Sequence, residues 1–157
     1  MDYRELLKLA TDETTRPLIV GVAVERQSRN PVPLSVVLIV EDELFTLEAA
    51  EIVIQDMGHR TLSASDTDEA QSLLRSPHRI DVLFTDIYLK TAILGGLKIA
   101  EEATKLRPNL RVLYATGTFI TENMRARFVE GAQCLRKPYS VQLLQDAITD
   151  LLPARGS

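Results

Sequence analysis

Polar residues that could do chemistry stand at the ends of four short apolar runs. In chain order they are Glu41 and Asp42, then Asp86, then Thr116, then Lys137. Clustered carboxylates repel one another and raise each other's pKa, and a hard divalent cation such as Mg²⁺ removes that cost. A carboxylate held beside Mg²⁺ can attack phosphorus as a nucleophile. This set of residue types could therefore form and hold an aspartyl phosphate.

Phosphoryl transfer depends mostly on positioning and on neutralising negative charge. Here Mg²⁺ would supply one centre of positive charge and Lys137 a second, while the Thr116 hydroxyl would add a hydrogen bond. Taken singly, the residues have plainer explanations: Glu41 and Asp42 could cap a helix, and Asp86 could be a turn residue. The hypothesis therefore depends on elements that bring all of them together.

The elements that must position these residues alternate regularly after residue 34. Apolar, β-branched runs predict strands at 35–40, 59–65, 80–86, 110–116 and 132–136. Helical spacing, caps and stop signals predict helices at 44–57, 66–74, 96–106, 121–130 and 140–152. Such repeated β-α units predict a doubly wound, flavodoxin-like α/β fold with parallel strand order 2-1-3-4-5. The carboxyl ends of these strands, and so the site, are expected at one edge of the sheet.

The rest of the sequence limits the domain organisation and the partners. We predict an N-terminal extension and linker at 1–33 and one domain at 34–157. The formal net charge of −4 offers no basic surface for nucleic acid. No apolar run approaches the roughly 20 residues of a membrane span, and the N-terminus lacks a signal-peptide pattern. We therefore expect a soluble, cytoplasmic protein that binds neither nucleic acid nor membrane.

From about residue 34 to residue 152 the sequence resembles the receiver domains of bacterial two-component response regulators. The matching stretches are VVLIVEDE (36–43), VLFTDIYL (82–89), GGLKIA (95–100), LYATG (113–117) and CLRKPYS (134–140). The resemblance implies that Glu41 and Asp42 organise Mg²⁺ with Asp86 and the backbone carbonyl of Tyr88. It also implies that Asp86 accepts the phosphoryl group.

The resemblance further implies partners and a means of output. Thr116 would be the switch hydroxyl and Lys137 the lysine of the family's site. A sensor histidine kinase or a histidine phosphotransfer protein would supply the phosphoryl group, and a downstream protein would recognise the phosphorylated form. The face formed by the fourth helix, fifth strand and fifth helix would carry that contact, or a homodimer. With no output domain after the last helix, we expect a single-domain phosphoacceptor rather than an enzyme, with at most self-phosphorylation and self-dephosphorylation.

Cys134 and Lys90 are two of the positions at which the chain departs from the family pattern. Cys134 stands where an aromatic switch residue is usual, and we interpret it as a small core residue rather than a redox group. Lys90 stands where a proline is frequent. The stretch YATGTF (114–119) resembles the Phe-Ala-Thr-Gly-apolar-Tyr motif of a subgroup of single-domain regulators. In that subgroup the aromatic after Thr-Gly serves as the switch, and Phe119 would hold its position.

Three alternative functions stay open at this point. The chain could be a phosphate sink that drains a shared kinase, or a phosphate-independent interaction module with the same fold. It could also be a haloacid-type hydrolase with an Asp nucleophile. That class carries a second Asp two residues after the first, where this chain has Tyr88, and the sequence contains no evident cap domain.

Overall fold

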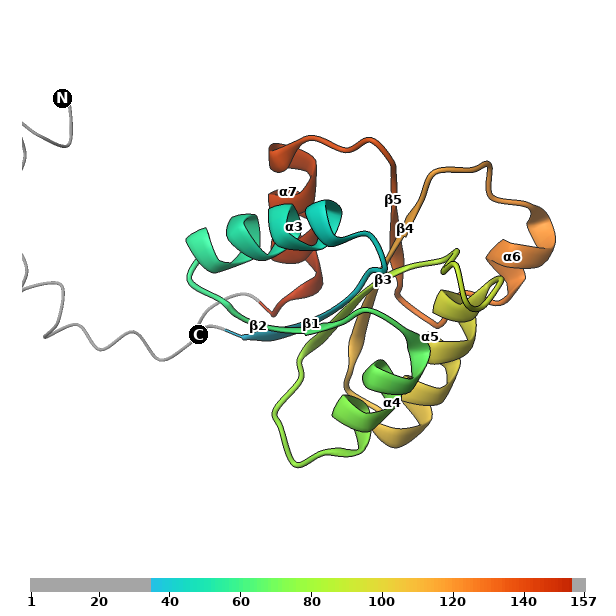
Figure 1. The fold of residues 1–157 in the computed structure, drawn as a ribbon, viewed down its shortest axis with the longest axis horizontal. Coiled ribbons are helices and arrows are strands. Elements are labelled where there is room, and N and C mark those ends of the chain that lie inside the picture. The colour runs from blue at the N-terminus through green and yellow to red at the C-terminus, as the bar shows by residue number, and fades with distance from the viewer. Residues whose placement is uncertain (1–34, 154–157) are drawn as a thin grey trace, which may run out of the picture. The chain divides into compact units, whose positions relative to one another are not determined.

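In a computed structural model that describes residues 35–153, the described strands form one parallel sheet (Figure 1). They are β1 (Val36–Val40), β2 (Arg60–Ala64), β3 (Val82–Asp86), β4 (Arg111–Thr116) and β5 (Gln133–Arg136). Their order is β2-β1-β3-β4-β5, and every neighbouring pair is parallel. The predicted doubly wound fold and its strand order are therefore confirmed.

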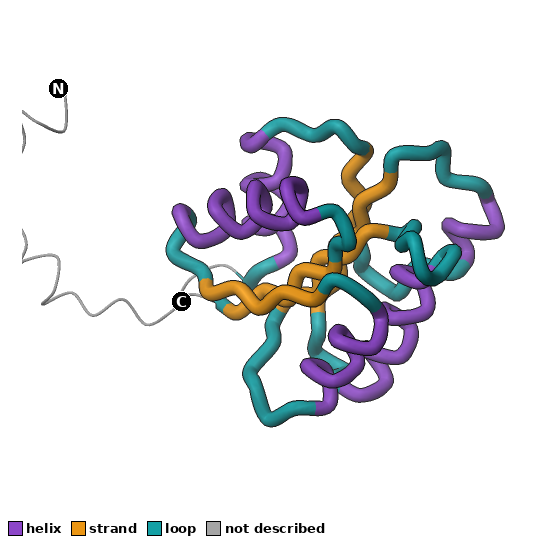
Figure 2. The backbone as a smooth tube through the Cα atoms, in the orientation of Figure 1, coloured by secondary structure: helices purple, strands orange, loops and turns teal. Residues whose placement is uncertain are grey.

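Helices cover both faces of this sheet (Figures 1 and 2). On one face lie α3 (Leu44–Asp56) and α7 (Val141–Leu151), and on the other lie α4 (Thr67–Arg75), α5 (Gly95–Leu106) and α6 (Glu122–Ala126). Each face has its own cluster of buried apolar side chains. The sheet is thus the middle layer of three, and its central strands are shielded from water on both sides.

Strand β1 shows why the predicted strands read as continuous apolar runs. Val37 and Ile39 belong to the core cluster under α3 and α7, whereas Leu38 and Val40 belong to the cluster on the opposite face. Successive side chains of a strand point to opposite faces. Because both faces are covered, every position along β1 must be apolar.

The first residues of two helices confirm predicted caps, and the start of α3 excludes Glu41 and Asp42 as helix caps. The side chains of Asp66 and Ser140 each accept a hydrogen bond from the backbone amide three residues further on, at 2.8 and 3.1 Å. Helix α3 begins after Glu43, whose side chain makes no cap hydrogen bond. Glu41 and Asp42 precede that cap position, so they are not the caps of α3.

The helix predicted at 121–130 is wrong in its extent, because α6 ends at Ala126. The ring of Phe128 packs on the buried ring of Tyr114 in β4, with 4.5 Å between centroids. The backbone amide of Val129 donates to the Tyr114 hydroxyl at 3.3 Å. These contacts with β4 draw the chain out of helical geometry, and no local periodicity in the sequence could have signalled them.

The N-terminal extension predicted at 1–33 lies outside the described residues, so the domain boundary stays a prediction. The longest described helix, α3, has 13 residues, whereas a bilayer span takes about 20. Within 35–153 there is accordingly no helix that is both long and apolar enough to cross a membrane.

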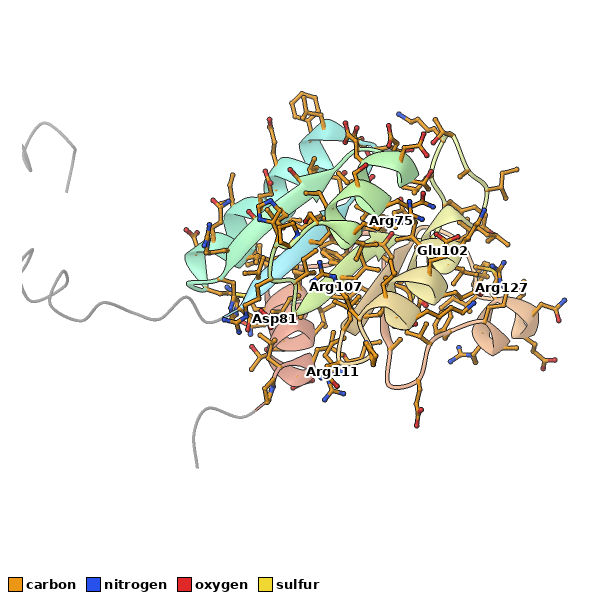
Figure 3. All side chains as sticks on the ribbon, turned by 90° about the horizontal axis from the view of Figure 1, so that it is seen from below. Arg75, Asp81, Glu102, Arg107, Arg111 and Arg127 are labelled. Atoms are coloured by element: carbon orange, nitrogen blue, oxygen red, sulfur yellow. The ribbon has the colours of Figure 1, made fainter. Side chains whose placement is uncertain are left out.

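Arg107, at the C-terminal end of α5, holds the loop that follows α4 (labelled in Figure 3). Its guanidinium donates to three backbone carbonyls, those of Leu74 at 3.0 Å, Ser76 at 2.9 Å and His78 at 2.9 Å. Helix C-termini leave carbonyls without partners within the helix, and a planar five-donor group can satisfy several of them together.

We expect Arg107→Met to lower the free energy of unfolding by about 2 kcal/mol, because charged donors to these carbonyls are lost together. Urea denaturation measures the change. Arg111→Met is the matched control, since Arg111 is an exposed arginine at the start of β4, and it should change stability by less than about 0.5 kcal/mol. Equal effects of the two substitutions would contradict the role given to Arg107.

Candidate functional site

The register of the sheet brings the ends of β1, β3, β4 and β5 to one edge. Asp86 pairs with Ala115, and Thr116 pairs with Arg136. The backbone amide of Lys137 donates to the Thr116 carbonyl at 2.8 Å, which extends the pairing of β4 and β5 by one residue. The predicted site residues therefore lie on adjacent strands at the carboxyl edge of the sheet.

Lys137 links two of the predicted carboxylates directly. Its Nζ donates to Glu41 Oε2 at 2.6 Å and to Asp86 Oδ2 at 2.8 Å. The side chains of Glu41 and Asp86 are only 6% and 11% exposed, and that of Lys137 is 22% exposed. These ion pairs are shielded from solvent, so removing Lys137 would leave two poorly hydrated carboxylates without their cation.

The carboxylates outnumber the positive charge beside them. One carboxylate oxygen from each of Glu41, Asp42 and Asp86 lies within 4.8 Å of the other two. Burial raises the pKa of Glu41, although the hydrogen bond from Lys137 acts to lower it. Burial acts to lower the pKa of Lys137, but hydrogen bonds to Asp86 and Glu41 outweigh it and raise that pKa. The ammonium of Lys137 therefore stays charged. Three carboxylates beside one ammonium leave a net negative charge, which favours binding of a second cation.

The donor set fits Mg²⁺, which prefers carboxylate and carbonyl oxygens. Glu41, Asp42 and Asp86 would provide the carboxylates. The backbone amide of Tyr88 donates to Asp86 Oδ1 at 3.3 Å and so holds that carboxylate; the role of the Tyr88 carbonyl as a ligand stays a prediction. The backbone amide of Lys90 donates to Asp42 Oδ2, a short contact that was not predicted from the sequence. Almost any residue can donate through its backbone amide, so no sequence pattern could have revealed this hydrogen bond.

Gly96 allows α5 to begin directly behind Asp86. A Cβ atom at Gly96 would lie 1.9 Å from the backbone oxygen of Asp86 and 2.8 Å from the Cα of Ile87. The Gly96 amide donates to the Ile87 carbonyl at 3.1 Å. Only a residue without a Cβ permits this approach. Gly96 thereby fixes the backbone that carries the Asp86 side chain.

Thr116 ends β4 with no exposed surface, and its hydroxyl turns to the loop that follows. The backbone amide of Thr118 donates to Thr116 Oγ1 at 3.2 Å, and the two hydroxyl oxygens are also 3.2 Å apart. Thr118 was not singled out in the sequence. A threonine two residues beyond a strand end is an ordinary loop residue until the fold of the loop is known.

A family model for the response regulator receiver domain matches residues 37–149 of this sequence. The chain belongs to that family. Similar solved structures include a response regulator receiver protein from Sinorhizobium medicae (27% identity, 78% of this chain and 97% of that one, TM-score 0.70). A receiver domain protein from Clostridium thermocellum is 29% identical over 75% of this chain and 94% of its own, with a TM-score of 0.66.

The receiver fold also occurs within longer chains. NtrX from Brucella abortus is 27% identical over 76% of this chain but only 27% of its own length, with a TM-score of 0.68. The chain is therefore a receiver domain of two-component signalling. Such domains interact with histidine kinases or phosphotransfer proteins and generally bind Mg²⁺ at an acidic cluster, and this chain has an acidic group formed by Glu41, Asp42 and Asp86.

Two further receiver positions singled out in the sequence lie near β5. Phe119 is 77% exposed, and the guanidinium carbon of Arg136 lies 4.3 Å from the centre of its ring. Cys134 is half-buried beside the core cluster that contains Tyr114, its partner in the β4–β5 register. An aromatic ring thus occupies the interior next to Cys134 from the neighbouring strand. The switch roles of Phe119 and Cys134 stay predictions.

Burial raises the pKa of the Cys134 thiol from its ordinary value of 9.0 to about 11. Because the thiolate is the reactive form, a pKa higher by about 2 lowers reactivity near neutral pH about 100-fold. We expect iodoacetamide to alkylate the folded chain about 100-fold more slowly than the chain unfolded in urea, with a rate that climbs up to pH ~11. The folded state disfavours the thiolate, so its stability should fall as the pH rises from about 9 to 11. Equal rates for folded and unfolded chains would contradict the buried environment of the thiol.

Proposed function

We propose that this receiver domain accepts a phosphoryl group on Asp86 in a Mg²⁺-dependent reaction. The donor would be the phosphohistidine of a sensor histidine kinase or a histidine phosphotransfer protein. The observation that supports this most strongly is the position of the Asp86 carboxylate, 2.8 Å from the Lys137 ammonium and within the oxygen cluster of Glu41 and Asp42. A nucleophile, its charge-neutralising group and the oxygens for a cation thus stand together.

In the proposed reaction an oxygen of Asp86 forms a bond to phosphorus as the bond between phosphorus and the donor's imidazole nitrogen breaks. The imidazole leaves with the electron pair of that bond. Lys137 neutralises charge on the transferred group, because its ammonium already contacts Asp86. Mg²⁺ held by Glu41, Asp42 and Asp86 would supply the remaining neutralisation. The chain is in this view a phosphoacceptor and not an enzyme that turns over a separate substrate.

Phosphorylation would alter the surface near β4 and β5. A phosphoryl group brings about −1.5 to −2 charges to the Asp86 position. The Thr116 hydroxyl, at the end of the neighbouring strand, would be drawn toward it. We propose that the face formed by α6, β5 and α7 then presents a changed surface to a downstream protein or to a second copy of the chain. This mode of output requires no chemistry beyond phosphorylation itself.

The proposal is tested by incubating the full chain with a radiolabelled small-molecule phosphodonor, with and without excess chelator. The label should appear only when Mg²⁺ is present, should be released by hydroxylamine as expected of an acyl phosphate, and should map to the peptide that contains Asp86. Label on another residue, or label that persists in the presence of chelator, would contradict the proposal. Rapid loss of label from Asp86 would instead point to a phosphate sink.

A further inference from the structure

The Thr116 hydroxyl is already engaged by the loop that follows β4. Thr116 has no exposed surface, and within residues 35–153 its hydroxyl forms hydrogen bonds with Thr118. The Thr118 amide lies 3.2 Å from Thr116 Oγ1, the Thr118 hydroxyl 3.2 Å, and the Thr118 carbonyl oxygen 3.4 Å. Thr118 therefore contacts the same hydroxyl that a phosphoryl group at Asp86 would attract.

The number of donors and acceptors limits the hydrogen bonds that the Thr116 hydroxyl can make. A hydroxyl has one proton to donate and two lone pairs that accept. The Thr118 amide donates to one lone pair, so the Thr116 proton can be directed to the Thr118 hydroxyl or to the more distant carbonyl oxygen. Both distances exceed the usual range of about 2.5–3.0 Å for O–H···O bonds. The contact is weak enough to be exchanged for a hydrogen bond to a charged acceptor.

We propose that the Thr118 side chain is a positioning residue that competes with a phosphoryl group at Asp86 for the Thr116 hydroxyl. This inference rests on the proposed function, because the competitor is a phosphoryl oxygen. Hydrogen bonds to charged acceptors are about twice as strong as those between neutral groups, so the phosphoryl oxygen takes the proton. The Thr118 side chain thereby sets how readily the phosphorylated conformation forms.

Loss of the contact between Thr116 and Thr118 can change the protein surface. When Thr116 turns to the phosphoryl group, the Thr118 hydroxyl loses its partner and the loop between β4 and α6 is released at that point. The next residue, Phe119, lies against the guanidinium of Arg136 on β5. The loop thus joins the buried hydroxyl to an exposed aromatic–cation contact on the proposed output face.

Thr118→Val tests the competition, because valine keeps the branched shape and lacks the hydroxyl. The competing contact contributes at most as much as one ordinary hydrogen bond, which limits the change in the equilibrium constant to about ten-fold. We expect the full-length variant to bind beryllium trifluoride, in the presence of Mg²⁺, about two- to ten-fold more tightly than the wild type. Thr118→Ser keeps the hydroxyl and should bind like the wild type. Titration followed by NMR gives these affinities.

A second background separates positioning from a structural effect of the loop. With Thr116→Val already present, Thr118→Val should leave the affinity unchanged, since there is no hydroxyl left to compete for. In the protein without the analogue, Thr118→Val should also shift the methyl resonance of Thr116 toward its position in the complex. Thr118→Ala provides a second deletion of the hydroxyl if the valine variant does not fold.

The outcomes distinguish this inference from the proposed function. Wild-type protein that binds the analogue, together with unchanged or weaker binding by Thr118→Val, would overturn the inference and leave the proposed function standing. The same tightening in the Thr116→Val background would also overturn it, because the effect would not depend on the Thr116 hydroxyl. Wild-type protein that does not bind the analogue in Mg²⁺ would overturn both.

Discussion

Asp86→Asn is expected to reduce incorporation of phosphate from a small-molecule donor with Mg²⁺ to background. The amide is nearly the same size as the carboxylate but is a poor nucleophile, and it brings no negative charge to the Lys137 ammonium or to a cation. Radiolabel incorporation into the full chain measures the effect. Because every step of the proposed reaction passes through this carboxylate, we expect the largest functional loss here.

The Asp86→Asn variant should still fold. Lys137 keeps its hydrogen bond to Glu41 at 2.6 Å, and removing one of three clustered carboxylates relieves repulsion among them. Thermal unfolding without Mg²⁺ should therefore show no loss of stability. Asp68→Asn, at an exposed position in the first turn of α4, is the control and should retain full labelling. Intact labelling of Asp86→Asn would remove Asp86 from its assigned role.

Gly96→Ala is expected to destabilise the fold by about 3 kcal/mol or more. The new Cβ would lie 1.9 Å from the backbone oxygen of Asp86, and a backbone atom of a buried strand cannot move aside as a flexible side chain can. Either α5 must shift away from β3 or the end of β3 must move with Asp86. Urea denaturation measures the loss of stability.

Gly117→Ala is the matched control for this substitution. A Cβ at Gly117 would meet no atom within 4 Å, and Gly117 is absent from the glycines with positive φ among the described residues. We expect that variant to differ from the wild type by less than about 0.5 kcal/mol. If the two alanine variants were equally stable, the close approach of α5 to β3 would not be a constraint on the fold.

The expected displacement of Asp86 in Gly96→Ala also has a functional consequence. Any fraction of the variant that folds should be labelled more slowly, because positioning of the carboxylate against Lys137 is what the site provides. Labelling per folded molecule, measured well below the unfolding temperature, separates this effect from the loss of stability. Gly117→Ala should be labelled at the wild-type rate.

The sequence by itself determined the sheet, its order and the candidate site residues. Apolar runs and helical spacing are local patterns, and covered parallel strands require them. Once the elements alternate as β-α units, the carboxyl ends of the strands must meet at one edge of the sheet. The sequence alone could therefore group the five site residues, which are Glu41, Asp42, Asp86, Thr116 and Lys137. Their grouping follows from topology rather than from side-chain geometry.

The tertiary structure decided which groups touch. Lys137 and Glu41 are 96 residues apart in the chain, and only the register of the strands places them within 2.6 Å. The early end of α6 follows from the packing of Phe128 on Tyr114, a contact between separate elements. Backbone donors and loop conformations likewise leave no residue-type pattern, which is why the hold of Thr118 on the Thr116 hydroxyl became visible only in the folded chain.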